Sequence, residues 1–286
     1  MRKLRKTFAE RRKSPGRNNR LFTLGIAVCA LWVLVALLAP AIIPYDPLAQ
    51  ALDERFSPPN IRHLCGTDSL GRDIFSRLLI GSRVSIGCGL LTIVFAALVG
   101  VIYGGIAGYL GGAIDEVMMR LAELVQAFPT IILAMVISSA LGPSLFHTLL
   151  AMIIVWWPNF ARLMRSSVIQ IRSGEYIEAA RSLGSSGLRI FFHDILPNSI
   201  GSVVVMATVD FGSAILLFSG LSFLGLGSPP PAPEWGAMVS DGAAYLSYWW
   251  IGTFPGLGIL TLSMGANFIG DGMRDLLDPR LRREVK

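Results

Sequence analysis

Residues 173–198 read SGEYIEAARSLGSSGLRIFFHDILPN and lie between two long apolar runs of the chain. Their first part predicts a short helix that ends at Gly184, because glycine readily adopts the left-handed conformation that terminates a helix. A second short helix follows, and Pro197 suits the first turn of the next one. Apolar residues recur at three-residue spacing on one face of the first helix: Ile177, Ala180 and Leu183. Such a loop is either an ordinary solvated connection or a surface that docks into a groove on a soluble partner.

The composition around this loop is that of a membrane protein. The chain has 286 residues, 53% of them hydrophobic and 15% charged, whereas soluble proteins carry about 25% charged residues. A helix needs about 20 apolar residues to cross a bilayer. Six runs of about that length are present, at residues 21–43, 84–110, 124–141, 143–161, 198–224 and 243–270. We therefore predict an all-α membrane protein with six transmembrane helices. The first run exceeds the apolar region of about 7–15 residues in a signal peptide, so we expect an uncleaved anchor.

The basic residues predict the orientation. The chain has 25 Lys and Arg against 19 Asp and Glu. Most of the basic residues lie before the first run, in loop 162–196 and after the last run, and positive loops favour the cytoplasm. We expect both termini in the cytoplasm. The expected parts are a basic N-terminus (1–20) that contacts anionic lipid rather than nucleic acid, a first span (21–43), an outer loop (44–83), a core (84–273) and a tail (274–286).

The sequence contains no motif for catalysis or for nucleotide binding. None of its four lysines follows a glycine, so a G-x-x-x-x-G-K phosphate loop cannot form. H-E-x-x-H and G-x-S-x-G are also missing, and the three histidines are far apart. The three cysteines predict no disulfide framework. We expect no catalytic residue, no metal site and no cofactor bound by this chain, so any energy must come from a partner.

The loop resembles the EAA signature of permease subunits in binding-protein-dependent ABC importers. Glu178-Ala179-Ala180, Gly184 and Leu196-Pro197 fall at its offsets, and one position departs, since Asp194 replaces the usual isoleucine. Further stretches are similar to the C-type permeases of dipeptide, oligopeptide and nickel importers. They are GTDSLGRDIFSR (66–77), GSRVS (81–85), SFLGLG (222–227), EWG (234–236), GDGMRD (270–275) and LDPR (277–280). The resemblance extends over about residues 21–280.

This resemblance implies a type I ABC importer permease fold and a set of partners. These would be a homologous B-type permease, two ATPase subunits that bind ATP and Mg, and a periplasmic or lipid-anchored substrate-binding protein. The loop would be the coupling element, through Glu175, Tyr176, Glu178, Ala179, Ala180, Arg181, Leu183, Gly184, Leu196 and Pro197. Short peptides are the expected solutes, while nickel and glutathione-like molecules stay open. An ATP-independent secondary transporter is a weaker alternative, because internal repeats and half-helices are not evident.

Asp210 is the candidate pathway residue. It lies about 20 Å into the run at 198–224, at 1.5 Å per residue. An acid in hydrocarbon is costly, so it should face the bundle interior or an aqueous path. It either contacts the solute or makes a hydrogen bond that fixes helix packing.

The outer side supplies the candidate contacts with a binding protein. Residues 72–83 have an amphipathic pattern, which is typical of a helix lying on the membrane surface. That helix would meet the binding protein or the second permease, or would be a plain interfacial anchor. Residues 229–233 are proline-rich and cannot be helical, so they predict a rigid ledge. The candidate contact residues are Arg72, Asp73, Arg77, Glu234 and Trp235.

Overall fold

The computed structural model describes residues 15–277. Most of the basic N-terminus and the end of the predicted tail, with the LDPR stretch after Leu277, lie outside the described residues. The described part is helical and has no β-strand, as predicted. Its elements are α2 (Pro15–Ile42), η1 (Leu52–Glu54), α3 (Ile74–Leu110), α4 (Gly112–Gln126), α5 (Thr130–Leu141), α6 (Leu145–Arg172), α7 (Glu175–Ser182), α8 (Gly187–Arg189), η2 (Ile190–Ile195), α9 (Leu196–Phe223), α10 (Trp235–Ala244) and α11 (Trp250–Leu277).

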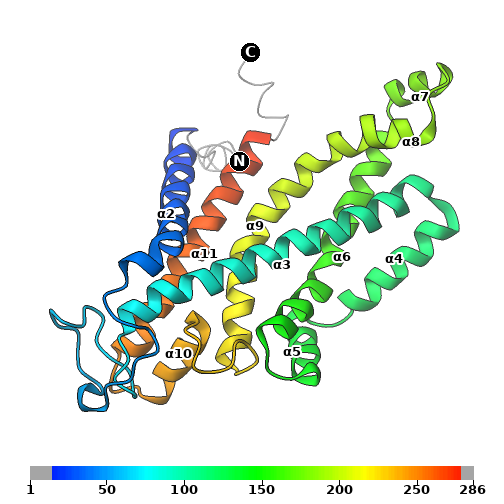
Figure 1. The fold of residues 1–286 in the computed structure, drawn as a ribbon. Helices are drawn as coiled ribbons and strands as arrows, with labels where there is room; N and C mark the ends of the chain where they lie inside the picture. The colour runs from blue at the N-terminus through cyan, green and yellow to red at the C-terminus, as the bar shows by residue number, and fades with distance from the viewer. Residues whose placement is uncertain (1–14, 278–286) are drawn as a thin grey trace, which may run out of the picture.

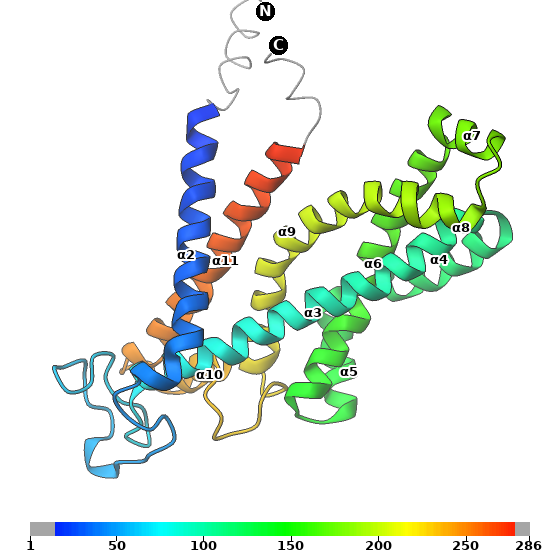
Figure 2. The same cartoon turned by 45° about the horizontal axis from the view of Figure 1, so that its top comes forward.

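Helix α3 crosses the whole molecule and joins its two ends (Figures 1 and 2). Helices α2 and α11 pack beside each other at one end, and α4, α5 and α6 lie at the other. Helix α9 runs between them. Close approach of α3 to α6 requires glycine, since a Cβ on Gly104 would lie 2.0 Å from the Ala161 carbonyl oxygen. Small residues are the usual means of such helix contact in membranes.

The six predicted spans correspond to fewer long apolar helices. Three helical stretches of the described chain are long and apolar enough to cross a bilayer, namely Arg20–Ile42, Ile74–Leu110 and Gly187–Phe223. The pair α4 and α5, bent by 84° at a short break, makes a fourth if it counts as one span. Helices α6 and α11 are each 28 residues long but are not among them. Length and composition therefore do not confirm a count of six.

The broken pair corrects the prediction that half-helices are missing. The run at residues 124–141 was expected to be a single span. Instead, α4 ends at Gln126 and α5 begins at Thr130. Pro129 supplies the reason, because a proline disfavours the helical conformation in the residue before it.

The loop before α9 also differs from the expectation of two short helices and a separate span. From Gly187 to Phe223 the helix is continuous, with a π-helical turn at Ile190–Ile195. Pro197 lacks an N–H group, and its ring would clash with a carbonyl in a regular α-helix. The wider turn accommodates it, and the Asn198 side-chain amide donates to the Asp194 carbonyl oxygen at 2.6 Å. Pro197 lies in the first turn of α9, as predicted, while the π turn before it makes the helix continuous from Gly187.

Candidate functional site

Two regions at opposite ends of the molecule contain most of the predicted functional residues. The inner arm is defined here as residues 173–195, with α7, α8 and the π turn. The outer lobe is defined as residues 43–73 together with α10 and the chain around it. Figures 1 and 2 show the inner arm projecting beyond α3 and α6, while the outer lobe surrounds the start of α3.

The end of α7 matches the prediction for Gly184. Its φ angle is +81°. The Gly184 N–H donates to the Arg181 carbonyl at 2.9 Å, and the Ser185 N–H donates to the Ala180 carbonyl at 3.1 Å. This pair of hydrogen bonds is the Schellman motif, which satisfies the last carbonyl groups of a helix.

Buried side chains anchor the inner arm to the rest of the chain. Ile177 of α7 and Ile190 and Ile195 of the π turn lie in one buried apolar cluster with residues of α3, α6 and α9, and Ala180 packs beside it. Leu183, which was expected on the same face, is 87% exposed because it follows the last helical residue. The other large apolar side chains of the arm that face solvent are Tyr176, Leu188 and Phe192. Exposed apolar side chains that lie together mark an interaction surface.

The predicted coupling residues are mostly accessible. Ala180 and Leu196 are half-buried, and the remaining ones are exposed, namely Glu175, Tyr176, Glu178, Ala179, Arg181, Leu183, Gly184 and Pro197. Their side chains can therefore meet a partner without rearrangement of the arm.

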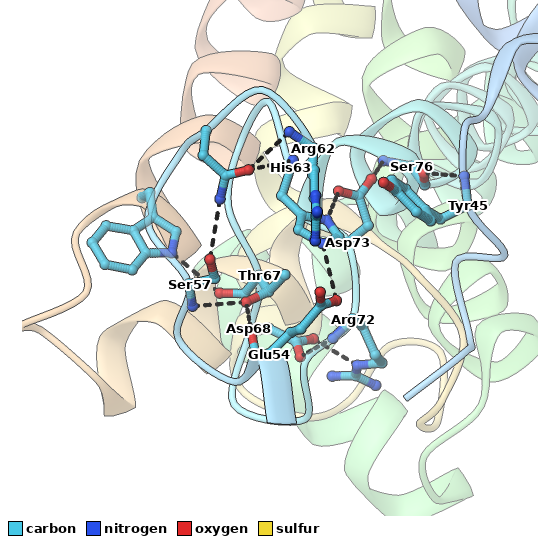
Figure 3. Close-up of polar contacts among 12 residues, drawn as sticks. Tyr45, Glu54, Ser57, Arg62, His63, Thr67, Asp68, Arg72, Asp73 and Ser76 are labelled. Carbon is cyan, nitrogen blue, oxygen red and sulfur yellow. Dashed lines mark hydrogen bonds and ion pairs between the residues drawn. The ribbon is translucent and has the colours of Figure 1, made fainter. Parts of the chain in front are cut away.

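The outer lobe is held by buried charges (Figure 3). The Arg72 Nε donates to the Asp68 carboxylate at 2.6 Å, and the Arg77 Nε lies 3.8 Å from the same carboxylate. Arg72 also reaches Asp241 of α10 at 3.6 Å. Arg77 donates to the Pro47 carbonyl at 3.1 Å. Buried ions are tolerated only when they are paired and hydrogen-bonded in this way.

A second set of polar contacts fixes the start of α3 (Figure 3). Asp73 caps the helix by accepting from the Ser76 N–H at 2.7 Å. The His63 ring lies between two carboxylates, 2.9 Å from Asp73 and 3.2 Å from Glu54. Burial and the nearby Asp73 charge raise the pKa of the Cys65 thiol to about 11, so this cysteine stays a neutral thiol.

The backbone conformation of the GTDSLGRD stretch requires glycine at position 71. Gly71 has a φ angle of +74°, and a Cβ there would lie 1.8 Å from the Ala51 carbonyl oxygen. The GTDSLGRD stretch is therefore a folded turn rather than a flexible loop.

Glu234 and Trp235 join the lobe to the helices. Glu234 begins α10 and accepts from the N–H groups of Gly236 and Ala237 at 2.9 and 3.0 Å. The Trp235 indole N–H donates to the Leu78 carbonyl at 2.9 Å. Both side chains are fully buried. Burial raises the pKa of Glu234, although these hydrogen bonds oppose the shift.

These observations correct the prediction of direct contacts with a binding protein. The candidate residues Arg72, Asp73, Arg77, Glu234 and Trp235 are at most 6% exposed. They hold the lobe together and present no surface. The helix expected on the membrane surface at residues 72–83 is instead the first part of α3, and it is covered by the lobe.

The sequence analysis missed the apolar residues that the lobe does expose. Ile61 is 96% exposed at the tip of a turn that Asn60 stabilises through hydrogen bonds from the Arg62 and His63 N–H groups. Leu64, Leu246 and Trp249 are exposed as well. The flanking Pro58 and Asn60 were the available signal for this turn.

Asp210 lies on α9 and is half-buried. It accepts a hydrogen bond from the Trp156 indole N–H of α6 at 2.8 Å. This contact supports the packing alternative for Asp210, while a role in the pathway stays a prediction.

Two family models match the chain in order. Residues 17–59 match the N-terminal transmembrane domain of oligopeptide transport permease C, and residues 100–283 match the binding-protein-dependent transport system inner membrane component.

Curated relatives cover nearly the whole chain. The probable D,D-dipeptide transport system permease protein DdpC of Escherichia coli is 42% identical over 88% of this chain and 85% of its own. The oligopeptide transport system permease protein OppC of Bacillus subtilis is 41% identical over 93% and 88%. Among solved structures, an inward-facing form of the MetNI methionine ABC transporter matches with a TM-score of 0.59 and 18% identity, covering 74% of this chain and 98% of that one. The last likeness shows a shared fold.

Proposed function

The chain belongs to the family of binding-protein-dependent transport system inner membrane components, and we propose that it is a permease subunit of an ATP-driven importer of short peptides. Its fold is the type I ABC importer permease fold that the sequence predicted. One observation supports the peptide substrate above others. Relatives that are 40–42% identical over nearly the whole chain are named as dipeptide, di/tripeptide or oligopeptide transport permeases.

The proposed complex contains this chain, a homologous B-type permease, two ATPase subunits and a substrate-binding protein. ATP and Mg are bound by the ATPases, and this chain contributes no catalytic residue. The inner arm is the proposed contact with one ATPase. Its exposed Tyr176, Leu183 and Leu188 supply apolar surface, and Ile177, the buried side chain of α7, ties that helix to the rest of the chain.

The proposed location is a bacterial inner membrane, with both termini and the inner arm in the cytoplasm and the outer lobe in the periplasm. The basic loop 162–196 supports this orientation. The rigid, exposed Ile61 tip and the neighbouring Leu64 are then accessible to a binding protein.

Asp210 is proposed to line the pathway. Its Oδ2 atom accepts from Trp156, which fixes the orientation of the carboxylate. In this proposal the Oδ1 atom accepts from the ammonium group of a peptide.

Co-purification and uptake test the proposal together. A tagged parent chain should bring down an ATPase pair from mild detergent, and cells with the complete importer should accumulate labelled dialanine. Glu178→Ala and Gly184→Asp should keep the fold and weaken ATPase recovery or uptake. Arg20→Ala, an exposed change at the inner end of α2, is the matched control. Uptake of nickel or glutathione in place of dialanine would reassign the solute, and transport without ATP hydrolysis would refute an importer.

A further inference from the structure

A polar cleft separates α4 from α6 in the inner half of the molecule. Its volume is about 300 Å³. The charged side chains along its walls are Asp115, Glu116, Arg120, Glu123, Arg162 and Arg165. Gln126 closes one end, where its amide donates to Asn159 at 2.8 Å, next to the break before α5. Helix α4 belongs to the bent pair that could cross a bilayer as one broken span, and charged groups in a spanning segment are costly and usually face an ion or solute path.

The charged residues of α4 lie on the side that borders the cleft, where Asp115 is buried and Glu116, Arg120 and Glu123 are exposed. Apolar side chains cover the opposite face of α4 and are exposed, namely Ile114, Val117, Leu121 and Leu124. A helix with such faces places its apolar side against lipid or protein and its polar side toward an aqueous space. The Arg165 guanidinium fixes this orientation through two hydrogen bonds to Asp115, at 2.5 and 2.6 Å.

The charges that remain in the cleft are of both signs. On α4, Arg120 lies 4.0 Å from Glu116 and 3.1 Å from Glu123, so this wall carries one acid in excess. On α6, Arg162 is exposed and makes no ion pair within the part of the chain that the structure describes. One wall thus suits an ammonium group and the other a carboxylate.

We propose that this cleft binds the two charged ends of a zwitterionic peptide on the inner half of its path. Glu116 and Glu123 receive the ammonium group, and Arg162 receives the carboxylate. Asp115 and Arg165 are positioning residues whose hydrogen bonds join the two walls. The inference rests on the proposed function, because it assigns the chemistry of that solute.

The mixed charge of the cleft walls favours a zwitterionic ligand. A peptide with ionised ends loses its hydration as it leaves water, and only groups of both signs can compensate both ends. The cleft walls carry three carboxylates and three arginines, so a ligand with charge of one sign would leave buried or paired groups of the other sign uncompensated. The apolar face of α4, and not the cleft, is also the surface that suits acyl chains.

The test uses the complete importer in proteoliposomes, with binding protein outside, ATP inside and labelled dialanine as the probe. Arg162→Glu should lower dialanine uptake about tenfold or more, because like charges brought together cost several kcal/mol. Arg162→Lys should restore most of the uptake. Arg20→Glu makes the same charge change on α2, outside the cleft, and should transport like the parent.

Two further readouts separate solute binding from a structural role. ATP hydrolysis stimulated by loaded binding protein should persist in Arg162→Glu, since the inner arm is unchanged. In an Arg162→Cys variant, a trimethylammonium-bearing thiosulfonate should restore uptake, a sulfonate-bearing one should not, and dialanine should slow both modifications. Ser166→Cys, on the same helix and outside the cleft walls, should show no protection.

The outcomes are distinguishable. Arg162→Glu transport equal to that of the parent, or equal losses of ATP hydrolysis and uptake, would overturn the cleft as a binding site while leaving the proposed function in place. A loss that disappears in phosphatidylcholine vesicles without anionic lipid would assign Arg162 to a headgroup and would also overturn it. Failure of the parent importer to take up dialanine would instead refute the proposed function.

Discussion

The inner arm and the outer lobe use similar residue types in opposite ways. In the outer lobe, acids and arginines are buried and bonded to one another, as Asp68 is to Arg72 and Arg77. In the inner arm, charged residues such as Glu178 face solvent beside exposed apolar side chains. Both regions carry sequence patterns that resemble a transport family, but only in the inner arm are the residues of the pattern mostly exposed to solvent.

This difference separates patterns that fold the chain from patterns that meet a partner. The charged groups of a buried motif interact with other groups of the same chain, so a substitution there mainly lowers the stability of the fold. The side chains of an exposed motif are available to another molecule, so a substitution there mainly weakens association. The predictions below test that division, from the largest expected effect to the smallest.

Asp68→Ala should produce the largest loss of stability. It leaves two buried arginines without their shared carboxylate, and breaking a buried ion pair from one side costs about 3–5 kcal/mol. We expect a much lower midpoint of thermal unfolding in detergent and little intact importer in membranes.

Asp53→Ala is the matched control, because Asp53 is an exposed acid in the same lobe and exposed substitutions usually change stability by no more than about 0.5 kcal/mol. Equal midpoints for Asp68→Ala and the parent would mean that the network is not needed for folding.

Ile177→Ala and Leu183→Ala should separate anchoring from docking within the inner arm. Ile177 is fully buried, and truncation of such a side chain costs about 2–5 kcal/mol. Because it is the buried anchor of α7, the loss should be local. Hydrogen exchange should rise in residues 173–195, while the unfolding midpoint of the whole chain changes little.

Leu183→Ala should leave exchange unchanged and weaken recovery of the ATPase, by about tenfold if the side chain is an interface hot spot. If Leu183→Ala raises hydrogen exchange as much as Ile177→Ala does, the distinction between an anchoring and a docking residue is wrong.

The sequence predicted the features that depend on local chemistry. The helical membrane class follows from the apolar runs, and the left-handed Gly184 follows from the residue type that ends a helix. The break at Pro129 was also readable, because the proline stands inside a run that was expected to be continuous. Features that depend on distant partners were not readable.

Arg72 and Arg77 illustrate this limit. Their charges predicted a surface helix, since a charge in isolation favours water. Asp68, the carboxylate that they share, is close in sequence, but their other partners lie far along the chain, at Asp241 and at the Pro47 carbonyl. The same applies to Asp210, whose hydrogen bond from Trp156 joins two helices. Sequence spacing gives no measure of either contact.

Gly184→Ala should have a smaller effect, confined to the inner arm. An alanine in the left-handed conformation costs about 1–2 kcal/mol, and no atom outside the local backbone lies within 4 Å of the position. We expect increased hydrogen exchange at the end of α7 and a partial loss of ATPase recovery. Gly184→Asn tolerates the conformation better and should recover more of the ATPase than Gly184→Ala. Equal losses for both would show that the side chain, rather than the backbone angle, disturbs the interface.

Glu234→Gln should give the smallest change in stability, and this change should depend on pH. Glu234 is a buried acid that lies outside the spanning helices. Burial raises the pKa of Glu234 in the folded chain, so the folded state holds the proton more tightly than the unfolded state does. Stability from this group is complete below the unfolded pKa of about 4.3 and is lost as the pH rises through the folded pKa. Glutamine keeps the size of the side chain and one acceptor for the α10 cap but does not titrate. The difference between the unfolding midpoints of the parent and Glu234→Gln should therefore favour the parent most at acidic pH and decrease toward neutral pH. Asp53→Asn should run parallel to the parent, and a parallel curve for Glu234→Gln would mean that the buried acid of the outer lobe keeps its ordinary pKa.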